Sequence, residues 1–223
     1  PFNGLTFGID VSADYQATKL KRTKLGYRFD LKTPYDNYKD IYLNLIGSHN
    51  VSNALAAIAI AEQSGLSANE FLDTLENFPG VYRRMNIYRW NESIIIDDYA
   101  HHPSEIKSVY NTIRSFYPSY QNCVIFQPHL YSRTRDFMKE FSMVLSMFDE
   151  VILLDIYPAR EKPIKGINSK TLLNNISTRK KRFMSKTEIK SALEESDAKI
   201  FAILGAGDIG LEFKNLNLLT TRQ

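Results

Sequence analysis

The sequence predicts an α/β protein whose main part is a Rossmann-like, doubly wound and mostly parallel sheet. After residue 80, short apolar runs alternate with stretches in which apolar residues recur at helical spacing, which is typical of βα units. Strands joined in this way run parallel through right-handed crossovers, with helices on both faces of the sheet. The residues before 80 follow another pattern, so we expect two domains, 1–80 and 81–223.

The first domain combines strands with a pair of helices. Alternating or aromatic segments between polar, glycine and proline turns predict strands at 5–9, 27–31 and 41–46. From Asn50 to Glu62 the apolar residues recur at helical spacing. Ser67 and Glu70 have the spacing of a capping box, which predicts a second helix ending near Asn77. The breaker Phe78-Pro79-Gly80 marks the domain boundary.

The second domain alternates strands and helices. Buried strands are predicted at 94–96, 123–126, 151–156 and 200–204. Helical spacing predicts helices at 103–116, from Phe137 to Phe148 and around Leu172. Ser185 and Glu188 form a second capping box, which predicts another helix after it. The loops that follow these strands are expected to line one edge of the sheet.

Three of those loops carry polar side chains suited to chemistry. They are 97–103, which reads Asp-Asp-Tyr-Ala-His-His-Pro, 127–135 and 157–163. Together they hold His101, His102, His129, Arg133, Arg135, Arg160 and Lys162. Taken alone, each arginine is explained as a solvated surface residue and each histidine as a core or loop residue. Their convergence at strand ends favours a site for phosphate or carboxylate groups.

Composition limits the classes of partner. Lys and Arg number 28 and Asp and Glu 25, a net charge of +3 that suits an anionic ligand but does not indicate nucleic acid. Cys123 is the single cysteine, which excludes an intramolecular disulfide and favours a reducing compartment. The longest apolar stretches, 54–61 and 151–154, are too short to cross a bilayer. We therefore expect a cytoplasmic protein that binds neither nucleic acid nor membrane.

The sequence Gly205-Ala206-Gly207-Asp208-Ile209-Gly210 follows a predicted strand and fits the dinucleotide-binding pattern G-x-G-x-x-G. That pattern also requires an acidic residue about 20 positions further on, on the next strand. Only 13 residues follow Gly210. A tight strand-to-helix turn with close packing is the better interpretation.

Five stretches, in this order, make the sequence similar to the Mur ligase family: 47–57, 78–84, 97–103, 126–134 and 155–163. The resemblance covers about residues 5–210. It implies that 1–80 is the carboxyl-terminal part of a central ATP-binding domain and that 81–223 is the carboxyl-terminal Rossmann-like domain. It also implies an ATP-dependent ligase that adds L-alanine to UDP-N-acetylmuramate through an acyl phosphate, for peptidoglycan synthesis, with ATP and magnesium as cofactors.

The resemblance also assigns residues to ATP. The nucleotide site would contain His49, Asn50, Asn53, Arg84 and Asp98. Side-chain amides three residues apart on one helix face can pair with an adenine edge, although Asn50 could equally be a helix cap. Asp97 is an alternative to Asp98. Because adjacent strand residues point to opposite faces, we expect only one of the two in the site.

The other end of the reaction would involve Tyr99, His101, His129 and Arg133. By resemblance, His101 joins Arg84 and Asp98 as a catalytic residue. Many family members have an arginine directly after the histidine of the second loop, where this chain has Leu130. That cationic contact is either missing or supplied by Arg133 or Arg135.

The phosphate-binding pattern G-x-x-x-x-G-K-[ST] does not occur in this sequence, which starts at Pro1 in mid-pattern. We therefore expect this chain to be the carboxyl-terminal fragment of a longer protein. An upstream segment would hold most of the ATP and magnesium, and the fragment alone would be inactive.

Three other functions stay open. One is a metal-dependent hydrolase with Asp97 or Asp98, His101, His102 and His129 as ligands. The second is a non-catalytic nucleotide-binding module. The third is a sister Mur ligase that attaches another amino acid or a peptide. The stretch 126–134 favours the alanine enzyme, because this loop varies most between sister ligases.

Overall fold

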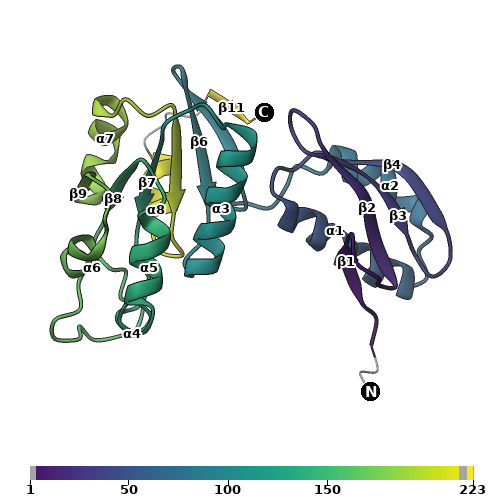
Figure 1. The fold of residues 1–223 in the computed structure, drawn as a ribbon, viewed down its shortest axis with the longest axis horizontal. Coiled ribbons are helices and arrows are strands. Elements are labelled where there is room, and N and C mark those ends of the chain that lie inside the picture. The colour runs from purple at the N-terminus through teal and green to yellow at the C-terminus, as the bar shows by residue number, and fades with distance from the viewer. Residues whose placement is uncertain (1–3, 216–219, 223) are drawn as a thin grey trace. The chain divides into compact units, whose positions relative to one another are not determined.

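The computed structural model describes residues 4–215 and 220–222, and the chain divides into two compact units at Gly80 (Figure 1). Unit 1 comprises residues 1–80 and unit 2 comprises residues 81–223. Within the described residues, no helix is both long and apolar enough to cross a bilayer.

Unit 1 is a four-stranded sheet, ordered β1-β2-β3-β4, with two helices packed on it. The strands are β1 (Phe7–Ile9), β2 (Tyr15–Arg22), β3 (Tyr27–Lys32) and β4 (Asn37–Leu43). β1 pairs parallel with β2, and the other neighbours pair antiparallel. The helices are α1 (Ser48–Gln63) and α2 (Ala68–Asn77), and the capping box of Ser67 and Glu70 is present. Both predicted helices are therefore confirmed.

Two strand predictions in unit 1 need correction. The sequence analysis missed β2, because lysines and arginine fill its second half and leave no apolar run. Only its first residues are deeply buried, with Tyr15 and Ala17 fully inside the core. The strand predicted over 41–46 ends at Leu43, because the chain leaves the sheet there to start α1 at Ser48.

Unit 2 contains, within its described residues, a seven-stranded sheet ordered β11-β5-β6-β10-β7-β8-β9. The parallel strands are β6 (Ser93–Asp98), β7 (Asn122–Phe126), β8 (Glu150–Leu153), β9 (Lys180–Phe183) and β10 (Ile200–Leu204). β5 (Asn86–Trp90) and β11 (Thr220–Arg222) are antiparallel additions at one side. The predicted α/β fold with a mostly parallel, doubly wound sheet is confirmed.

Helices cover both faces of this sheet (Figure 1). On one face lie α3 (Pro103–Phe116), α5 (Met138–Leu145) and α6 (Ser169–Asn175). On the other, α7 (Ile189–Glu195) and α8 (Ile209–Asn215) pack on a continuous apolar cluster that includes Ile125 and Phe201. Burying such side chains stabilises the unit by about 1.5–3 kcal/mol each. The sheet is thereby a rigid base for the loops at its edges.

The remaining differences from prediction have local causes. β5 and β9 were missed because their sequences, NIYRW and KKRF, are too polar to indicate buried strands. The helix predicted from Phe137 to Phe148 is α5 alone, preceded by the separate short helix α4 (Tyr131–Asp136). The strand predicted over 151–156 ends at Leu153. Ser185 does form a capping box, but it starts the 3-10 turn η1 (Lys186–Glu188), which α7 then continues.

Candidate functional site

The loops that follow β6, β7 and β8 meet at the carboxyl edge of the unit 2 sheet. Beyond the ends of β7 and β8, the chain still pairs through a bridge between His129 and Tyr157, and the two rings stack with their centroids 5.6 Å apart. The loop after β6 reaches the same place, because the His101 ring lies 5.9 Å from that of His129. The structure thus brings the three predicted loops together.

Five of the predicted side chains form a continuous row at this edge, which we call the edge row. Its members are Arg84, Tyr99, His101, His129 and Arg133. The Arg84 guanidinium lies 5.7 Å from the Tyr99 ring, and that ring meets His101 edge-on at 5.7 Å. At the other end, Arg133 Nη1 lies 3.4 Å from His129 Nδ1. Charged groups at both ends and aromatic rings between them suit a ligand with several anionic groups.

The two histidines of the edge row differ in which nitrogen is free. His129 Nδ1 faces a guanidinium that can only donate, so it accepts and the neutral ring carries its proton on Nε2. Burial, followed by the charges of Arg133 and His101, lowers the pKa of His129, and Glu161 opposes this only partly. His101 Nδ1 lies 3.0 Å from the carbonyl oxygen of Tyr99, so this nitrogen donates. The Nε2 of His101 is then the nitrogen available to accept a proton.

His102 has a structural role instead. It is the N-cap of α3, and its Nδ1 accepts from the Ser104 backbone N–H at 3.3 Å. Its ring packs edge-on against Phe137, with centroids 4.7 Å apart. Glu105 completes the cap by accepting from the backbone N–H groups of His101 and His102. The spacing from His102 to Glu105 is that of a capping box, a signal that the sequence analysis did not use.

The carboxylates of Asp97 and Asp98 both hold the segment 83–85. Asp97 accepts from Arg83 Nε at 3.0 Å, and Asp98 accepts from the backbone N–H groups of Met85 and Ala100, both at 2.8 Å. Both carboxylates thus bind protein groups at this edge, and the expectation that only one of them lies in the ligand site stays a prediction. β5 begins at Asn86 opposite Asp97, so residues 83–85 pass the end of β6 within reach of both. Neither carboxylate is exposed, at 2% for Asp97 and 5% for Asp98.

The tandem arginines at the start of unit 2 have opposite environments. Arg83 is 4% exposed and bound to Asp97, whereas the neighbouring Arg84 is exposed beside Tyr99. Of the two, only Arg84 was predicted from the sequence to be a site residue. Two adjacent arginines give no signal of which one is buried.

The predicted nucleotide residues of unit 1 occupy the first two turns of α1. Asn50 is buried and its Nδ2 donates to the Ile46 carbonyl at 2.8 Å, while Asn53 donates to Asn50 Oδ1 at 3.3 Å. The helix-cap alternative for Asn50 is wrong, because the N-cap is Gly47. The ring of His49 lies against Gly47, where an added Cβ would come within 2.5 Å of it. Asn53 is the exposed member of this amide pair.

The second loop identifies which arginine lies at the site. Leu130 adopts a left-handed backbone, with φ of 72°, and its N–H donates to the carbonyl of Tyr157. Arg135 forms an ion pair with Asp136, whereas Arg133 points to His129. Of the two candidates to replace the missing cation, Arg133 is therefore the one in the edge row. Arg160 and Lys162 are exposed in the third loop.

The glycine-rich segment after β10 is a close-packed turn, as predicted. Gly205 has a φ of 146°, and a Cβ there would lie 2.8 Å from the Gln127 carbonyl oxygen. A Cβ on Gly207 would lie 2.4 Å from Gln127 Oε1. α8 starts directly after this turn. The predicted tight strand-to-helix turn with close packing is confirmed.

Comparison with known proteins matches this fold and sequence to one family. A family model described as Mur ligase, glutamate ligase domain, matches residues 83–211, and one described as Mur ligase middle domain matches residues 2–61. The chain belongs to the Mur ligase family.

Several relatives of this Mur ligase chain are named UDP-N-acetylmuramate–L-alanine ligase. The protein from Flavobacterium psychrophilum is 44% identical over 94% of this chain, and that from Christiangramia forsetii is 42% identical over 97%. The solved UDP-N-acetylmuramate–alanine ligase from Thermotoga maritima is 27% identical, with a TM-score of 0.76 over 96% of this chain. The chain spans about half the length of these relatives, at 47%, 48% and 47%.

The geometry does not favour a metal-dependent hydrolase in this Mur ligase chain. Of the candidate ligands, Asp97 pairs with Arg83, Asp98 binds backbone amides and His102 caps α3. Across the part of the chain that the structure describes, no three His, Cys, Asp or Glu side chains are grouped to hold a metal ion.

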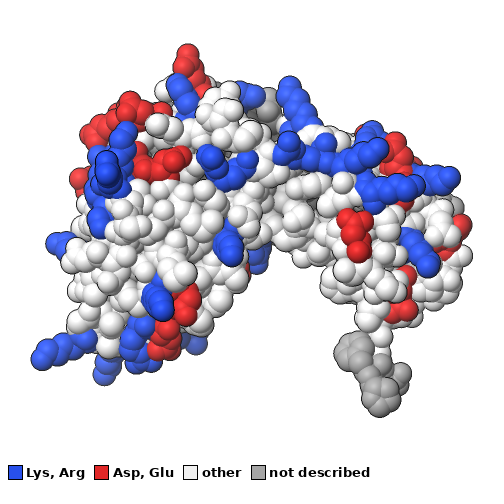
Figure 2. Space-filling view, in the orientation of Figure 1, with Lys and Arg blue, Asp and Glu red and all other residues white. Residues whose placement is uncertain are grey.

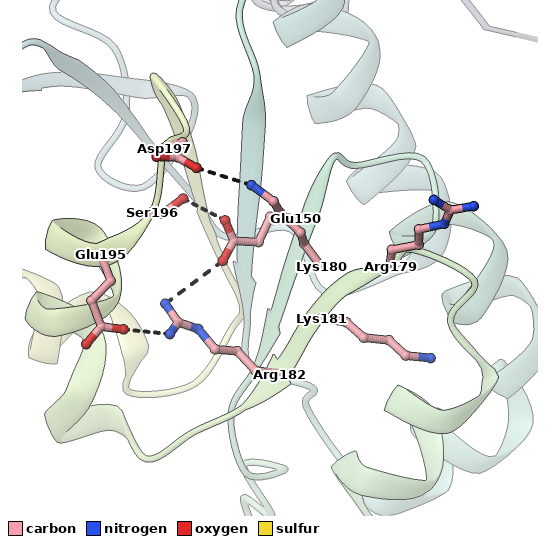
Figure 3. A pocket seen from close by; sticks show the side chains of 8 residues that line it. All are labelled: Glu150, Arg179, Lys180, Lys181, Arg182, Glu195, Ser196 and Asp197. Atoms are coloured by element: carbon pink, nitrogen blue, oxygen red, sulfur yellow. Dashed lines mark hydrogen bonds and ion pairs between the residues drawn. The ribbon is translucent and has the colours of Figure 1, made fainter.

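Charge gathers in two places on unit 2. Figure 2 shows lysines and arginines, with a few acidic residues, over α4 and the chain beside it. At the opposite, amino edge of the sheet, a pocket of about 390 Å³ has four basic and three acidic residues in its lining (Figure 3). Arg182 there pairs with Glu150 and Glu195, and Lys180 pairs with Asp197. Because all three acidic residues of this pocket are paired with basic ones, the carboxyl edge is the better candidate for a ligand site.

Proposed function

We propose that this chain is the carboxyl-terminal part of an ATP-dependent ligase that joins L-alanine to UDP-N-acetylmuramate. One observation carries the proposal: relatives with that name are 42–44% identical over nearly the whole chain, the three edge loops included. In this proposal residues 1–80 complete a central ATP-binding domain, and residues 81–223 form the carboxyl-terminal domain. Most of the ATP and magnesium contacts then belong to residues outside this chain.

Arg84, Asp98 and the start of α1 are the proposed contributions to ATP. The exposed guanidinium of Arg84 fits a phosphate group, and Asn53 is exposed with amide atoms to spare for a base edge. Asp98 lies at the end of β6, where it accepts from the backbone N–H groups of Met85 and Ala100, and the family resemblance assigns it to the nucleotide site. His49 and Asn50 would support Asn53 from the same helix turns. No residue of this chain is assigned to magnesium.

Tyr99, His101, His129 and Arg133 are the proposed contacts to the muramoyl and alanine groups. ATP would supply the phosphoryl group that converts the substrate carboxylate to an acyl phosphate. In this proposal His101 Nε2 takes the proton that the alanine amine loses when it attacks that carbonyl carbon, which is supported by the engagement of Nδ1 with the Tyr99 carbonyl. The Nε2–H of neutral His129 can donate to the oxyanion that forms, and Arg133 can pair with the alanine carboxylate.

The test is an assay of the full-length protein that contains this chain. We expect phosphate release from ATP that requires both UDP-N-acetylmuramate and L-alanine, with formation of UDP-N-acetylmuramoyl-L-alanine. Ligation of a different amino acid or a peptide, with none of L-alanine, would replace the proposal by the sister-ligase alternative. Phosphoester hydrolysis without ATP, dependent on zinc or manganese, would support the hydrolase instead.

A further inference from the structure

Arg84 sits between two residues that the end of β6 holds in place. On one side, Arg83 Nε donates to Asp97 Oδ1 at 3.0 Å. On the other, the Met85 backbone N–H donates to Asp98 Oδ2 at 2.8 Å. The two adjacent carboxylates therefore hold the side chain of Arg83 and the main chain of Met85, on either side of Arg84.

The Arg83 guanidinium fits a site that only its planar shape can fill. Its Nη1 donates to the Gly207 carbonyl at 3.3 Å and its Nη2 to the Asp98 carbonyl at 3.4 Å. It also packs closely against Gly210, where an added Cβ would come within 2.4 Å of Nε. A lysine could keep the charge near Asp97 but could not make these bonds together, because it presents a single nitrogen.

The backbone of this segment is held in an unfavourable conformation. Arg83 and Met85 have φ of 54° and 52°, in the left-handed region that residues other than glycine seldom adopt. Such conformations persist where surrounding contacts over-determine them, and they cluster at functional sites. Here the contacts are the two carboxylates and Asn86, whose Oδ1 accepts from the Arg83 N–H at 2.6 Å.

Arg83, which is not itself a member of the edge row, is also connected to the row through Tyr99. The Tyr99 N–H donates to the Arg83 carbonyl at 2.8 Å. The Tyr99 ring lies 5.4 Å from the guanidinium of Arg83 and 5.7 Å from that of Arg84. The buried arginine thus contacts the two residues at the start of the row.

We propose that Arg83 is a positioning residue, whose buried ion pair with Asp97 holds Arg84 and Tyr99 in place at the carboxyl edge. Arg83 does not touch the substrates; its effect on kcat/KM for ATP is exerted through Arg84. The effect on turnover rests on the proposed ligase function, whereas the effect on local structure does not.

A double-mutant cycle in the full-length protein tests this role. We expect Arg83→Lys to lower kcat/KM for ATP by about 100-fold, as misplacement of a contact group does. Arg84→Ala should lower it by about 100- to 1000-fold. If Arg83 acts through Arg84, the double variant will be within about two-fold of Arg84→Ala alone. A double variant that shows the product of both losses would overturn the proposal, as would an Arg83→Lys variant as active as the wild type.

Matched controls separate positioning from general stability. Arg182→Lys makes the same exchange in the ion pairs at the opposite edge (Figure 3) and should leave kcat/KM unchanged. Asp97→Asn, which keeps the shape of the acceptor, should reproduce the Arg83→Lys result in the same cycle. It serves as the test if the lysine variant does not fold.

Hydrogen exchange tests the geometry independently of the reaction. In Arg83→Lys, the amides of Met85, Tyr99 and Ala100 should exchange at least about ten-fold faster, while those of β7 and β8 keep their rates. Unchanged exchange at these three amides would refute the positioning role. If the wild type shows no ATP-dependent alanine ligation, the proposed function fails, and this measurement still decides the role of Arg83.

Discussion

Arg83 and Asp97 form an ion pair, 3.0 Å from Nε to Oδ1, in which both side chains are at most 5% exposed. Removing two charges from water is costly, and such a pair persists only with good geometry and further hydrogen bonds. Arg83 has those bonds, to the carbonyl groups of Asp98 and Gly207. The pair links the entry of unit 2 to the end of the strand that carries the site.

This pair gives unit 2 a characteristic pH dependence. Burial raises the pKa of Asp97 from 3.8 to about 6, against the opposing charge and hydrogen bond of Arg83. The folded state therefore binds this proton more tightly than the unfolded state, so the stability contribution is present below pH 4 and is lost as the pH rises through 6. The full effect is about 3 kcal/mol, and about 1 kcal/mol of it is present at pH 5.

The measurement is denaturant unfolding followed by the fluorescence of Trp90, the single tryptophan, which lies in unit 2. Other carboxylates titrate in the same range, so the quantity compared is the difference between the wild type and Asp97→Asn. We expect the wild type to gain stability relative to the variant as the pH falls from 7 to 5. A constant difference over that range would show that Asp97 does not titrate there.

Arg133 and Arg135 should differ in their effect on His129. Burial and then the charge of Arg133 lower the pKa of His129 from 6.5, whereas Arg135 forms an ion pair with Asp136. In Arg133→Ala, the pKa of His129 should rise toward its ordinary value, whereas Arg135→Ala should leave it unchanged. An NMR titration of the four histidines measures this directly. Equal shifts in both variants would contradict the placement of Arg133 in the edge row.

The adjacent histidines should separate activity from stability. His102→Ala removes the cap of α3 and the contact with Phe137, so we expect a loss of about 1–2 kcal/mol in unfolding free energy. His101→Ala should leave stability within about 0.5 kcal/mol, because its pair with Glu105 is partly exposed. In the full-length protein it should lower kcat by about 100-fold or more, because the proton acceptor is lost. A loss of stability in His101→Ala together with a loss of kcat in His102→Ala would show that the two roles are reversed.

A glycine substitution tests the packing against Arg83. In Gly210→Ala, the new Cβ would be 2.4 Å from Arg83 Nε, and the guanidinium cannot move without breaking its other bonds. We expect a loss of about 1–3 kcal/mol in the stability of unit 2, as for other overpacked sites. Gly166→Ala is the comparison, because its backbone is left-handed but nothing lies within 4 Å. The loss in Gly166→Ala measures the cost of left-handed strain without overpacking, and an unchanged stability in Gly210→Ala would show that the guanidinium yields freely.

The sequence predicted elements whose signals are local. α3 spans 103–116 as expected, because apolar periodicity and a proline at its start coincide. Neither β9 nor β2 was predicted, because their lysines and arginines form no apolar pattern and pairing with neighbouring strands stabilises them. Lysines on an edge strand such as β9 also discourage pairing with other chains.

The candidate site, like the fold, was predicted in part. Strand ends located the three loops, and the family resemblance selected the five members of the edge row. The burial of Arg83 could not be predicted, because it depends on how the residues just before β5 pass the end of β6. Nor could the cap formed by His102 be told from a ligand by residue type alone, since the same imidazole serves both purposes.

The central proposal is ligation through an acyl phosphate, and oxygen transfer tests it most directly. The full-length protein would be given UDP-N-acetylmuramate with ¹⁸O in its carboxylate, together with ATP and L-alanine. If an acyl phosphate forms, one labelled oxygen will appear in inorganic phosphate for each amide made. In Arg84→Ala, the transfer of label to phosphate and the formation of product should both fall by about 100- to 1000-fold. Label in AMP, or amide formation with none in phosphate, would contradict the proposed reaction.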